Sequence, residues 1–355
     1  MVSVAINIPI SQSRKESRRS WIGFANAFTL SLETIFIESL TIFLEIPPIT
    51  LAATSIPMAG GMLLFIVVFG MKRKLTIFRS WKYLLPGSAF IAIGIITWYD
   101  SVSRIGAAKE SVLFGPIGTL AVLFLARFFL HERLSTLQLV GVIIAIFGFF
   151  LSVASAAVGS PLSWFSLGDL EVILSGIAFA AAIIYLTKLT RIHSSIEVAG
   201  GSLLISGVIL ATFQWIYSPI VPSVNDWLFL SLYSLFPLIG ALLYSISLAK
   251  LGASLTSTFE SSANLMTIVL LLILREFGYR SIFPENIPVL VLGGILGVVG
   301  ISLIHLNDVT LFRRAFIEFC KRSSLHQRKT LLSLVASRQG NHMTVGHSLR
   351  LLRSV

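Results

Sequence analysis

The chain has 355 residues but a single cysteine, Cys320, and few charged residues. One cysteine excludes an intramolecular disulfide and a metal site built from several thiolates. Charged residues make up 12% of the sequence, about half the share that is usual in soluble domains. With 55% hydrophobic residues and a mean hydropathy of +0.89, the composition indicates a membrane protein.

The sequence also lacks the motifs of several enzyme classes. It contains no HExxH, no GxSxG, no CxxC and no Gly-rich phosphate loop. His131 and His305 stand alone, without a second ligand at the spacing of a metal site. We therefore expect no catalytic residue, no metal and no cofactor, and an integral-membrane enzyme is the weaker hypothesis. Because an ATP-binding motif is missing too, any transport should draw on a gradient.

The apolar residues are grouped in ten long runs. About 20 apolar residues in a helix cross the roughly 30 Å hydrocarbon core of a bilayer. Backbone polar groups need partners inside lipid, so each run should be helical. The sequence thus predicts an all-α integral membrane protein with ten transmembrane helices. Their approximate bounds are 21–45, 48–71, 83–103, 107–128, 135–156, 168–189, 195–217, 226–249, 253–275 and 286–306.

Basic residues indicate the orientation of these spans. If the N-terminus is cytoplasmic, 23 of the 27 Lys and Arg residues fall in the leader, the inner loops and the tail. Arg104, Lys109, Arg275 and Arg280 are the four that fall outside. Such an excess is typical of cytoplasmic segments. The sequence predicts that both termini lie inside, and that the net charge of +11 serves contact with anionic lipid and not with nucleic acid.

A group of residues recurs at a fixed offset of 146 positions. Ten spans divide into two halves of five, and an odd number per half means that the halves enter the membrane from opposite sides. Many carriers place their substrate between two such inverted repeats and alternate between inward-open and outward-open states. The recurring residues are Gly94, Arg104, Ile105, Gly106 and Ala107, which return as Gly240, Lys250, Leu251, Gly252 and Ala253.

Composition divides the chain into five parts. Residues 1–20 are predicted to be a cytoplasmic leader, 21–156 the first five-helix repeat and 168–306 the second. The uncharged segment 157–167 has the composition of a loop and should link the two repeats. The basic segment 307–355 is predicted to be a cytoplasmic tail, either disordered or folded as an amphipathic helix on the anionic inner leaflet.

Several short segments resemble a known family. They are Pro47-Pro48-Ile49-Thr50-Leu51-Ala52-Ala53, Arg104-Ile105-Gly106-Ala107-Ala108, Gly115-Pro116 with His131-Glu132-Arg133-Leu134-Ser135, and the counterpart Lys250-Leu251-Gly252-Ala253. In their order, each half resembles an EamA-type domain of the drug/metabolite transporter superfamily. The resemblance implies transport of small organic metabolites and a central cavity lined by spans 1, 3, 4, 6, 8 and 9. The ninth span departs from the pattern, since it has no proline to match Pro116.

Acidic residues inside the spans are the first candidates for a functional site, because an ionisable group is costly in lipid. Glu38 belongs to a polar stripe on one face of the first span. Glu33 is also a candidate, but it points about 140° away from Glu38, so we expect it to contact a neighbouring helix instead of the cavity. The stripe consists of Ser31, Thr34, Glu38, Thr41 and Glu45.

The ninth span carries a second polar stripe, formed by Ser257, Glu260, Asn264 and Thr267. The hypothesis is that Glu38 and Glu260 bind a cationic or amine-bearing substrate, or carry a proton coupled to it. The alternative is that each carboxylate is tied to polar groups in helix packing. Glu38 is expected in the outer half of the membrane and Glu260 about 10 Å from the cytoplasmic end. The two would then line one pathway without touching.

Five further residues complete the predicted site. Glu110, at the start of the fourth span, is expected at the cavity mouth. Tyr185 and Tyr244 are expected to offer hydroxyl groups to a ligand. Pro116 and Pro237 should kink spans 4 and 8, because proline removes a helical hydrogen bond. Such kinks either act as gates or shape the cavity.

Other residues favour structural roles. Asp100 and Arg104, four positions apart, should form an ion pair at the membrane interface. Trp98 and Tyr99 are typical of the aromatic belt at a membrane surface.

These features predict a secondary active transporter in the plasma membrane, a permease or exporter. The acidic stripes favour an amino acid or another amine-bearing solute, moved by alternating access with or without proton coupling. A nucleotide-sugar or sugar-phosphate exchanger of the same superfamily is the alternative, and it should carry Lys or Arg deep in its spans. A non-transporting receptor is a third hypothesis. The expected partners are the solute and anionic lipid, and Gly293, Gly297 and Gly300 allow close packing within one half or in a homodimer.

Overall fold

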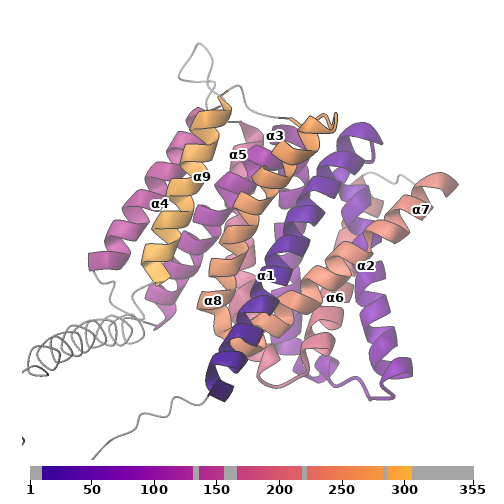
Figure 1. Cartoon of the computed structure of the whole chain (residues 1–355). Helices are drawn as coiled ribbons and strands as arrows, with labels where there is room; N and C mark the ends of the chain where they lie inside the picture. Colours follow the sequence, from indigo (N-terminus) through magenta and orange to yellow (C-terminus); the bar gives the residue numbers. More distant parts are fainter. Residues whose placement is uncertain (1–9, 131–135, 156–165, 218–221, 283–285, 306–355) are drawn as a thin grey trace, which may run out of the picture. The chain divides into compact units, whose positions relative to one another are not determined.

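The computed structural model describes residues 10–130, 136–155, 166–217, 222–282 and 286–305. These parts of the chain form helices and no strand, as the predicted all-α class requires (Figure 1). Within them, five helical stretches are long and apolar enough to cross a membrane, so the chain is a multi-pass membrane protein. The ten-span count and the orientation stay predictions. The five stretches are Pro48–Gly70, Ile77–Ala121, Leu167–Thr190, Ser195–Tyr217 and Asp226–Leu251.

In the first half, the residues that the structure describes form four long helices. α1 begins inside the predicted leader. A short π-helical segment follows directly after the last residue of α1. α2 starts with a proline, which suits the first turn of a helix because its missing N–H would have no partner there. The helices are α1 (Ile10–Glu38), the π-helical segment Ser39–Phe43, α2 (Pro48–Phe65), α3 (Trp81–Leu130) and α4 (Thr136–Ala154).

The described parts of the second half form five helices. Ser166 caps α5 through a reciprocal arrangement, in which its hydroxyl accepts from the Asp169 N–H and the Asp169 carboxylate accepts from the Ser166 N–H. The helices are α5 (Leu167–Thr190), α6 (Ser195–Tyr217), α7 (Val224–Tyr233), α8 (Leu235–Glu276) and α9 (Ile287–His305).

Gly106 divides α3 into two arms, at the turn that the sequence predicts between the third and fourth spans. Its φ of 80° and ψ of 154° lie in a region that is open to glycine and closed to other residues. A Cβ at this position would also meet the carbonyl oxygen of Ile282. Gly106 is therefore required both for the backbone turn and for the close approach of the chain beyond α8.

α8 is helical from Leu235 to Glu276, including the predicted turn at Gly252. It must nevertheless turn back on itself. A straight helix would separate Pro237 from Thr267 by about 45 Å, yet both residues line the same cavity. The predicted eighth span is further interrupted at Ser234, between α7 and α8. Pro237 lies in the first turn of α8, and its ring would clash with the carbonyl of Tyr233 in a continuous helix. The interruption thus falls before Pro237.

Helices of the two halves pack against each other in pairs. α2 contacts α6, and α4 lies beside α9 (Figure 1). α1 packs on α8, and α5 packs on α3. In the α2–α6 pair, a Cβ at Gly60 would meet the backbone nitrogen of Leu204, and Gly207 lies against Pro57. The core therefore runs between the halves and not only within each of them.

The glycines of α9 have their partners in the same chain, across the two halves. A Cβ at Gly300 would lie 2.5 Å from the backbone nitrogen of Ala145 in α4, and Gly293 lies against Ser152 of the same helix. A Cβ at Gly297 would lie 3.0 Å from the Pro116 ring in α3. The expectation of packing within one half is therefore wrong, because α4 and α3 belong to the first half. A homodimer through these glycines would need a surface that α4 already covers.

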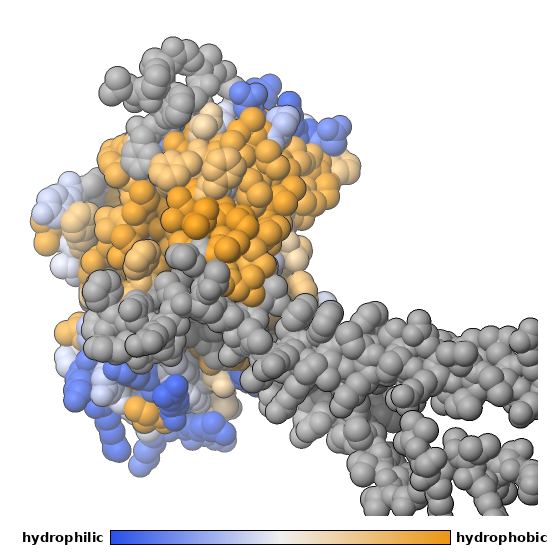
Figure 2. Space-filling view, turned by 90° about the vertical axis from the view of Figure 1, so that its left-hand side faces the viewer, coloured by the Kyte–Doolittle hydropathy of each residue, from blue (hydrophilic) through white to orange (hydrophobic). Residues whose placement is uncertain are grey.

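The side of the molecule shown in Figure 2 carries a broad apolar surface with hydrophilic residues at its upper and lower ends. Its composition fits the hydrocarbon core and the two polar interfaces of a bilayer. Over the described parts as a whole, exposed large apolar side chains include Ile143, Phe147 and Phe150 of α4 and Phe213 and Trp215 of α6. The predicted linker up to residue 165 and the predicted tail from residue 307 lie outside the described residues.

Candidate functional site

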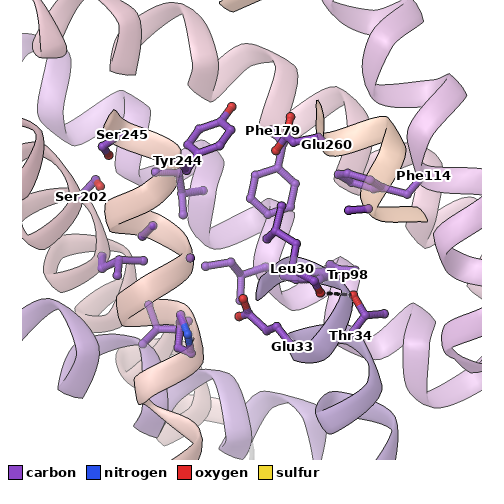
Figure 3. A pocket seen from close by; sticks show the side chains of 18 of the residues that line it. Leu30, Glu33, Thr34, Trp98, Phe114, Phe179, Ser202, Tyr244, Ser245 and Glu260 are labelled. Atoms are coloured by element: carbon purple, nitrogen blue, oxygen red, sulfur yellow. Dashed lines mark hydrogen bonds between the residues drawn. The ribbon is translucent and has the colours of Figure 1, made fainter. Parts of the chain in front are cut away.

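A cavity of about 140 Å³ lies among helices of both halves (Figure 3). Residues of α1, α3, α5 and α8 line most of it, and α2 and α6 add Ile56, Ser202 and Leu203. Because both arms of α3 and of α8 take part, the lining includes spans 1, 3, 4, 6, 8 and 9. The family resemblance implies these six spans, and the lining adds residues of the predicted second and seventh spans. We refer to this space as the central cavity.

Three carboxylic acids line the central cavity, and they come from three helices. They are Glu33 of α1, Glu110 of α3 and Glu260 of α8. Glu33 and Glu110 are 3% and 1% exposed, so neither can reach bulk water without a rearrangement. A buried carboxylate charge is costly unless a cation or several hydrogen-bond donors compensate for it. Each of these acids thus needs a proton or a positive ligand.

Glu33 is held by a short chain of phenol groups. The Tyr99 hydroxyl donates to Glu33 Oε1 at 3.3 Å, and the Tyr233 hydroxyl donates to the Tyr99 oxygen at 2.8 Å. Both tyrosines are buried. On the other side, a Cβ at Gly240 would lie 3.3 Å from Glu33 Oε2. Glu33 is therefore positioned by α3 and α7, and the absence of a side chain at Gly240 leaves room for its second oxygen.

Glu110 is less completely satisfied. The Ser111 hydroxyl lies 3.5 Å from Glu110 Oε2. Its other oxygen, Oε1, is buried and has no hydrogen-bond partner among the described residues. A buried acceptor without a donor is unfavourable, so this oxygen is available to a proton or to a donor on a ligand.

The second predicted stripe faces the central cavity. Glu260, Asn264 and Thr267 all line it, together with the predicted Tyr244. A Cβ at Gly115 would clash with the Asn264 side-chain nitrogen, so Gly115 allows the amide to pack against α3. The side chain of Ser257 lies outside the described residues. The role of this stripe in binding stays a prediction, since the geometry shows only its position.

Aromatic rings form another part of the lining. Phe179 of α5 makes edge-to-face contacts with Trp98 and Phe114, at centroid distances of 6.2 and 5.9 Å. A Cβ at Gly94 would lie 3.0 Å from the Phe179 ring. The expectation that Trp98 and Tyr99 belong to an interfacial belt is therefore wrong. Both side chains point inward because α3 packs against α5 and α1.

Six pairs of lining residues are separated by the repeat offset of 146 positions. Three of them carry the chemistry of the cavity. Glu33 corresponds to Phe179, Phe114 to Glu260, and Trp98 to Tyr244. The contacts follow the same rule, since Gly94 faces Phe179 as its counterpart Gly240 faces Glu33. The remaining pairs are Ile56 with Ser202, Ile91 with Pro237 and Ile95 with Ala241.

Sequence reasoning missed Trp98, Phe114 and Phe179, although a signal for them was present. Each stands 146 positions from a residue that the sequence does single out, namely Tyr244, Glu260 and Glu33. A hydrophobic side chain in a membrane span gives no other sign that it faces a cavity and not lipid.

Glu38 does not line the central cavity, and its predicted place in a solute pathway stays a prediction. Its carboxylate accepts from the Ser281 hydroxyl at 2.8 Å and from the Ile282 N–H at 2.9 Å. The Ala107 N–H adds a longer contact of 3.4 Å. Glu38 thus joins the end of α1 to the Gly106 turn and to the segment after α8. These bonds fit the alternative stated from the sequence, in which the Glu38 carboxylate is tied to polar groups in helix packing.

The polar stripe of α1 ends at Glu38 because the helix changes there. Thr41 belongs to the π-helical segment, and Glu45 lies beyond it with a φ of 53°. Ser31 lies 2.8 Å from two carbonyl oxygens, those of Ala27 in its own helix and Ala263 in α8, and Thr34 donates to the Leu30 carbonyl. Of this stripe, Thr34 lines the central cavity, whereas Ser31 packs against α8.

Two other predicted residues also lie apart from the lining of the central cavity. Tyr185 stacks on Phe90 at a centroid distance of 6.1 Å. Pro116 lies inside α3, ten residues beyond the break at Gly106, and lines a much smaller cavity beside α9. Pro237 does line the central cavity. A gating role for either proline stays a prediction.

Ion pairs surround the Gly106 turn. Arg104 binds Asp100 at 2.9 Å, which confirms the predicted pair, and it also binds Glu171 of α5 at 3.2 Å. Lys109 lies 2.7 Å from Asp169, and both side chains are buried. Lys109 is therefore engaged with α5 and does not neutralise Glu110, its neighbour in the sequence.

No Lys, Arg or His lines the central cavity in the parts of the chain that are described. The same parts contain no cluster of three or more His, Cys, Asp or Glu that could hold a metal ion. The site therefore has three acids, several neutral polar groups and an aromatic wall. Its chemistry suits a positively charged ligand or a proton.

Comparisons with known proteins agree with this architecture. Residues 20–154 and 166–306 each match the model of the EamA-like transporter family. A comparison with curated proteins finds no match. A solved crystal structure matches with a TM-score of 0.60 at 20% identity, over 83% of this chain and 99% of that chain. At that identity the likeness shows a shared fold and nothing about the ligand.

The two family matches cover both halves of the repeat, and the central cavity is built from both. The chain therefore belongs to the EamA-like transporter family of the drug/metabolite transporter superfamily, with two EamA domains.

Proposed function

We propose that the protein is a secondary carrier in the plasma membrane that moves a small organic solute bearing a protonated amine. The observation that supports this is the presence of three carboxylic acids, and no basic side chain among the described residues, in the lining of one cavity. Alternating access of the two halves around this cavity would expose the acids to each side of the membrane in turn. Both termini would lie in the cytoplasm.

The carboxylates have two roles in this proposal. Glu33, Glu110 and Glu260 would bind the amine, and one of them would hold a proton when the amine is absent. A buried acid that exchanges a proton for a cationic ligand couples their movements, because both compete for one negative charge. A proton gradient would then drive the solute, in keeping with a sequence that carries no ATP-binding motif.

The cavity offers little support for a nucleotide-sugar or sugar-phosphate exchanger. Phosphate groups are bound by Arg, Lys or clusters of backbone N–H groups. The buried Lys109 is paired with Asp169 at 2.7 Å and is not in the lining. A phosphate would therefore meet three acids without a compensating charge.

The test is uptake by proteoliposomes that contain the purified full chain. Labelled amino acids, amines, polyamines and nucleotide sugars would be compared with and without a pH gradient. We expect flux of an amine-bearing solute that depends on the gradient. Glu33→Gln and Glu260→Gln should each lower that flux at least tenfold, because both remove a negative charge from the cavity.

Glu276→Gln is the matched control, since Glu276 is exposed at the end of α8 and does not line the cavity. It should transport like the unaltered protein. Flux of a phosphorylated solute, or amine flux that survives both cavity variants, would refute the proposed role of the acids. Absence of flux for every solute would contradict the carrier function itself.

A further inference from the structure

We propose that the solute is an amphipathic organic cation with a single aromatic ring, or a hydrocarbon body of similar size, and no anionic group of its own. This narrows the proposed function and rests on it. The proposal distinguishes simple amines from amino acids, because an amino acid carries a carboxylate in addition to the amine. The groups of the central cavity that can donate, accept or stack distinguish these two kinds of solute.

The first step concerns the hydroxyl groups of the lining. Thr34 donates to the Leu30 carbonyl at 3.0 Å, and Thr267 donates to the Ala263 carbonyl at 3.0 Å. Ser202 donates to the Val198 carbonyl at 2.7 Å. Each hydroxyl proton is therefore used within its own helix, and only the oxygen lone pairs remain for a ligand. Three of the polar side chains in the lining thus accept and do not donate.

The charge of the solute distinguishes an amine from an amino acid at this site. A zwitterionic amino acid has a carboxylate that loses its water when it enters the cavity, and a buried carboxylate needs a cation or several donors. Glu33, Glu110 and Glu260 already need protons or a cation themselves, and no basic side chain lines the cavity in the described parts, so no positive charge remains to compensate the carboxylate of an amino acid. The neutral donors of the lining are Trp98, Tyr244, Ser245 and Asn264. A cation without a carboxylate meets no such penalty.

The third step concerns the apolar part of the ligand. Phe179 contacts Trp98 and Phe114 edge to face, so the three rings form a continuous aromatic wall. Aromatic faces attract organic cations and also stack on rings. Glu33 and Glu260 occupy the positions that correspond to Phe179 and Phe114 in the repeat. Each half thus provides one acid and one ring at matching positions, which gives a cation both kinds of contact.

The volume of the central cavity limits the size of the solute. The central cavity measures about 140 Å³, and an apolar cavity of about 150 Å³ in another protein holds one benzene molecule. The cavity therefore has room for one ring and not for a second.

The experiment uses three solutes that share one ring and differ in charge. Phenethylamine has the amine alone, phenylalanine has the amine and a carboxylate, and phenylacetate has the carboxylate alone. Their binding to the full chain in lipid nanodiscs is measured by isothermal titration calorimetry, and their flux is measured in proteoliposomes. We expect phenethylamine to bind at least tenfold more tightly than phenylalanine, and phenylacetate not to bind.

Two variants test the parts of the site. Glu33→Gln should weaken phenethylamine binding at least tenfold, and Phe179→Leu should weaken it about fivefold while preserving a hydrophobic side chain. Phe213→Leu, on an exposed part of α6, is the matched control and should bind normally. Thermal unfolding of each variant in the same nanodiscs shows whether it is folded, and Glu260→Gln replaces any variant that is not.

The outcomes separate this proposal from the carrier function. Binding of phenylalanine as tight as that of phenethylamine overturns the proposal, and so does failure of phenethylamine to bind. If amino acids are nevertheless transported, the carrier function stands and only the inference about charge is lost. If phenethylamine binds but no tested solute crosses the membrane, the site is as proposed and the transport function is refuted.

Discussion

Lys109 and Asp169 form a buried ion pair at a distance of 2.7 Å, next to the Gly106 turn. Such a pair gains little over a well-packed apolar pair, because both charges have lost their water. Removal of one partner lowers the stability by much more than the intact pair adds to it, because the other charge is left buried and uncompensated. The same chain offers an exposed pair for comparison, Asp100 with Arg104, whose side chains are 31% and 46% exposed.

Asp169→Asn should therefore destabilise the protein by about 3–5 kcal/mol, because the buried Lys109 ammonium loses its counter-charge. Asp100→Asn makes the same chemical change in the exposed pair and should cost at most about 1 kcal/mol. Thermal unfolding of both variants in the same detergent measures the difference. Equal shifts in the unfolding temperature would mean that burial does not distinguish the two pairs.

At the scale of the element, the segment after α8 is held against the end of α1. Glu38 accepts from Ser281 and Ile282, and Ser39 shares a hydrogen bond of 2.7 Å with the Tyr279 hydroxyl. These contacts connect α1, the Gly106 turn and the approach to α9. They explain why a glutamate that does not line the central cavity is nevertheless fully buried.

Glu38→Leu should remove this connection. Each buried donor left without an acceptor costs about 1–3 kcal/mol, and both Ser281 and Ile282 lose theirs. Glu38→Gln keeps one accepting oxygen and should be clearly milder. The unfolding temperature of the two variants, with Glu276→Gln as an exposed control, checks the order. A Gln variant as unstable as the Leu variant would show that the hydrogen bonds are not what holds the segment.

Tyr279 gives this segment a measurable pH dependence. Burial raises the pKa of its phenol from the ordinary value of 10 to about 12. Because the folded state binds the phenolic proton more tightly than the unfolded state, its contribution to stability is complete below about pH 10. That contribution is lost as the pH rises through about 12. A difference titration at 295 nm between the unaltered protein and Tyr279→Phe should show the phenolate only in that range, and ionisation near pH 10 would contradict the buried position.

At the scale of the whole molecule, the two halves meet through closely packed backbones. Gly60 and Gly61 are adjacent in α2, but their surroundings differ. A Cβ at Gly60 would meet the backbone of Leu204 in α6, whereas a Cβ at Gly61 would have nothing within 4 Å. The pair therefore separates the effect of interhelical contact from the effect of helix propensity.

Gly60→Ala should destabilise the protein by about 1–3 kcal/mol, because two backbones must move apart to admit one methyl group. Gly61→Ala should be neutral or stabilising by up to about 1 kcal/mol, since alanine favours a helix. Both are read from thermal unfolding of the detergent-solubilised chain. The α2–α6 contact between the halves would be disproved if Gly60→Ala were as stable as Gly61→Ala.

Much of the architecture can be predicted from composition and repeat. Long apolar runs require helices in lipid, and the repeated glycines mark the Gly106 turn and the Gly94 and Gly240 positions beside the cavity. The position of Glu260 follows from its place in a polar stripe, because a carboxylate cannot face lipid. Glu33 shows the limit of this reasoning. The sequence favours Glu38, yet the structure gives Glu33 the cavity and Glu38 the packing role.

The sequence by itself determined that the chain crosses the membrane as helices, that it has two related halves, and that acids are buried in it. These properties follow from local hydrophobicity and from repetition, which need no knowledge of neighbours. Only the tertiary structure decided which acids share a cavity, that Lys109 is engaged elsewhere, and that Trp98, Phe114 and Phe179 form one wall. From the sequence alone, a polar or aromatic face of a helix in lipid can lie against another helix or against a cavity. The packing of the helices of the other half decides which of the two it contacts.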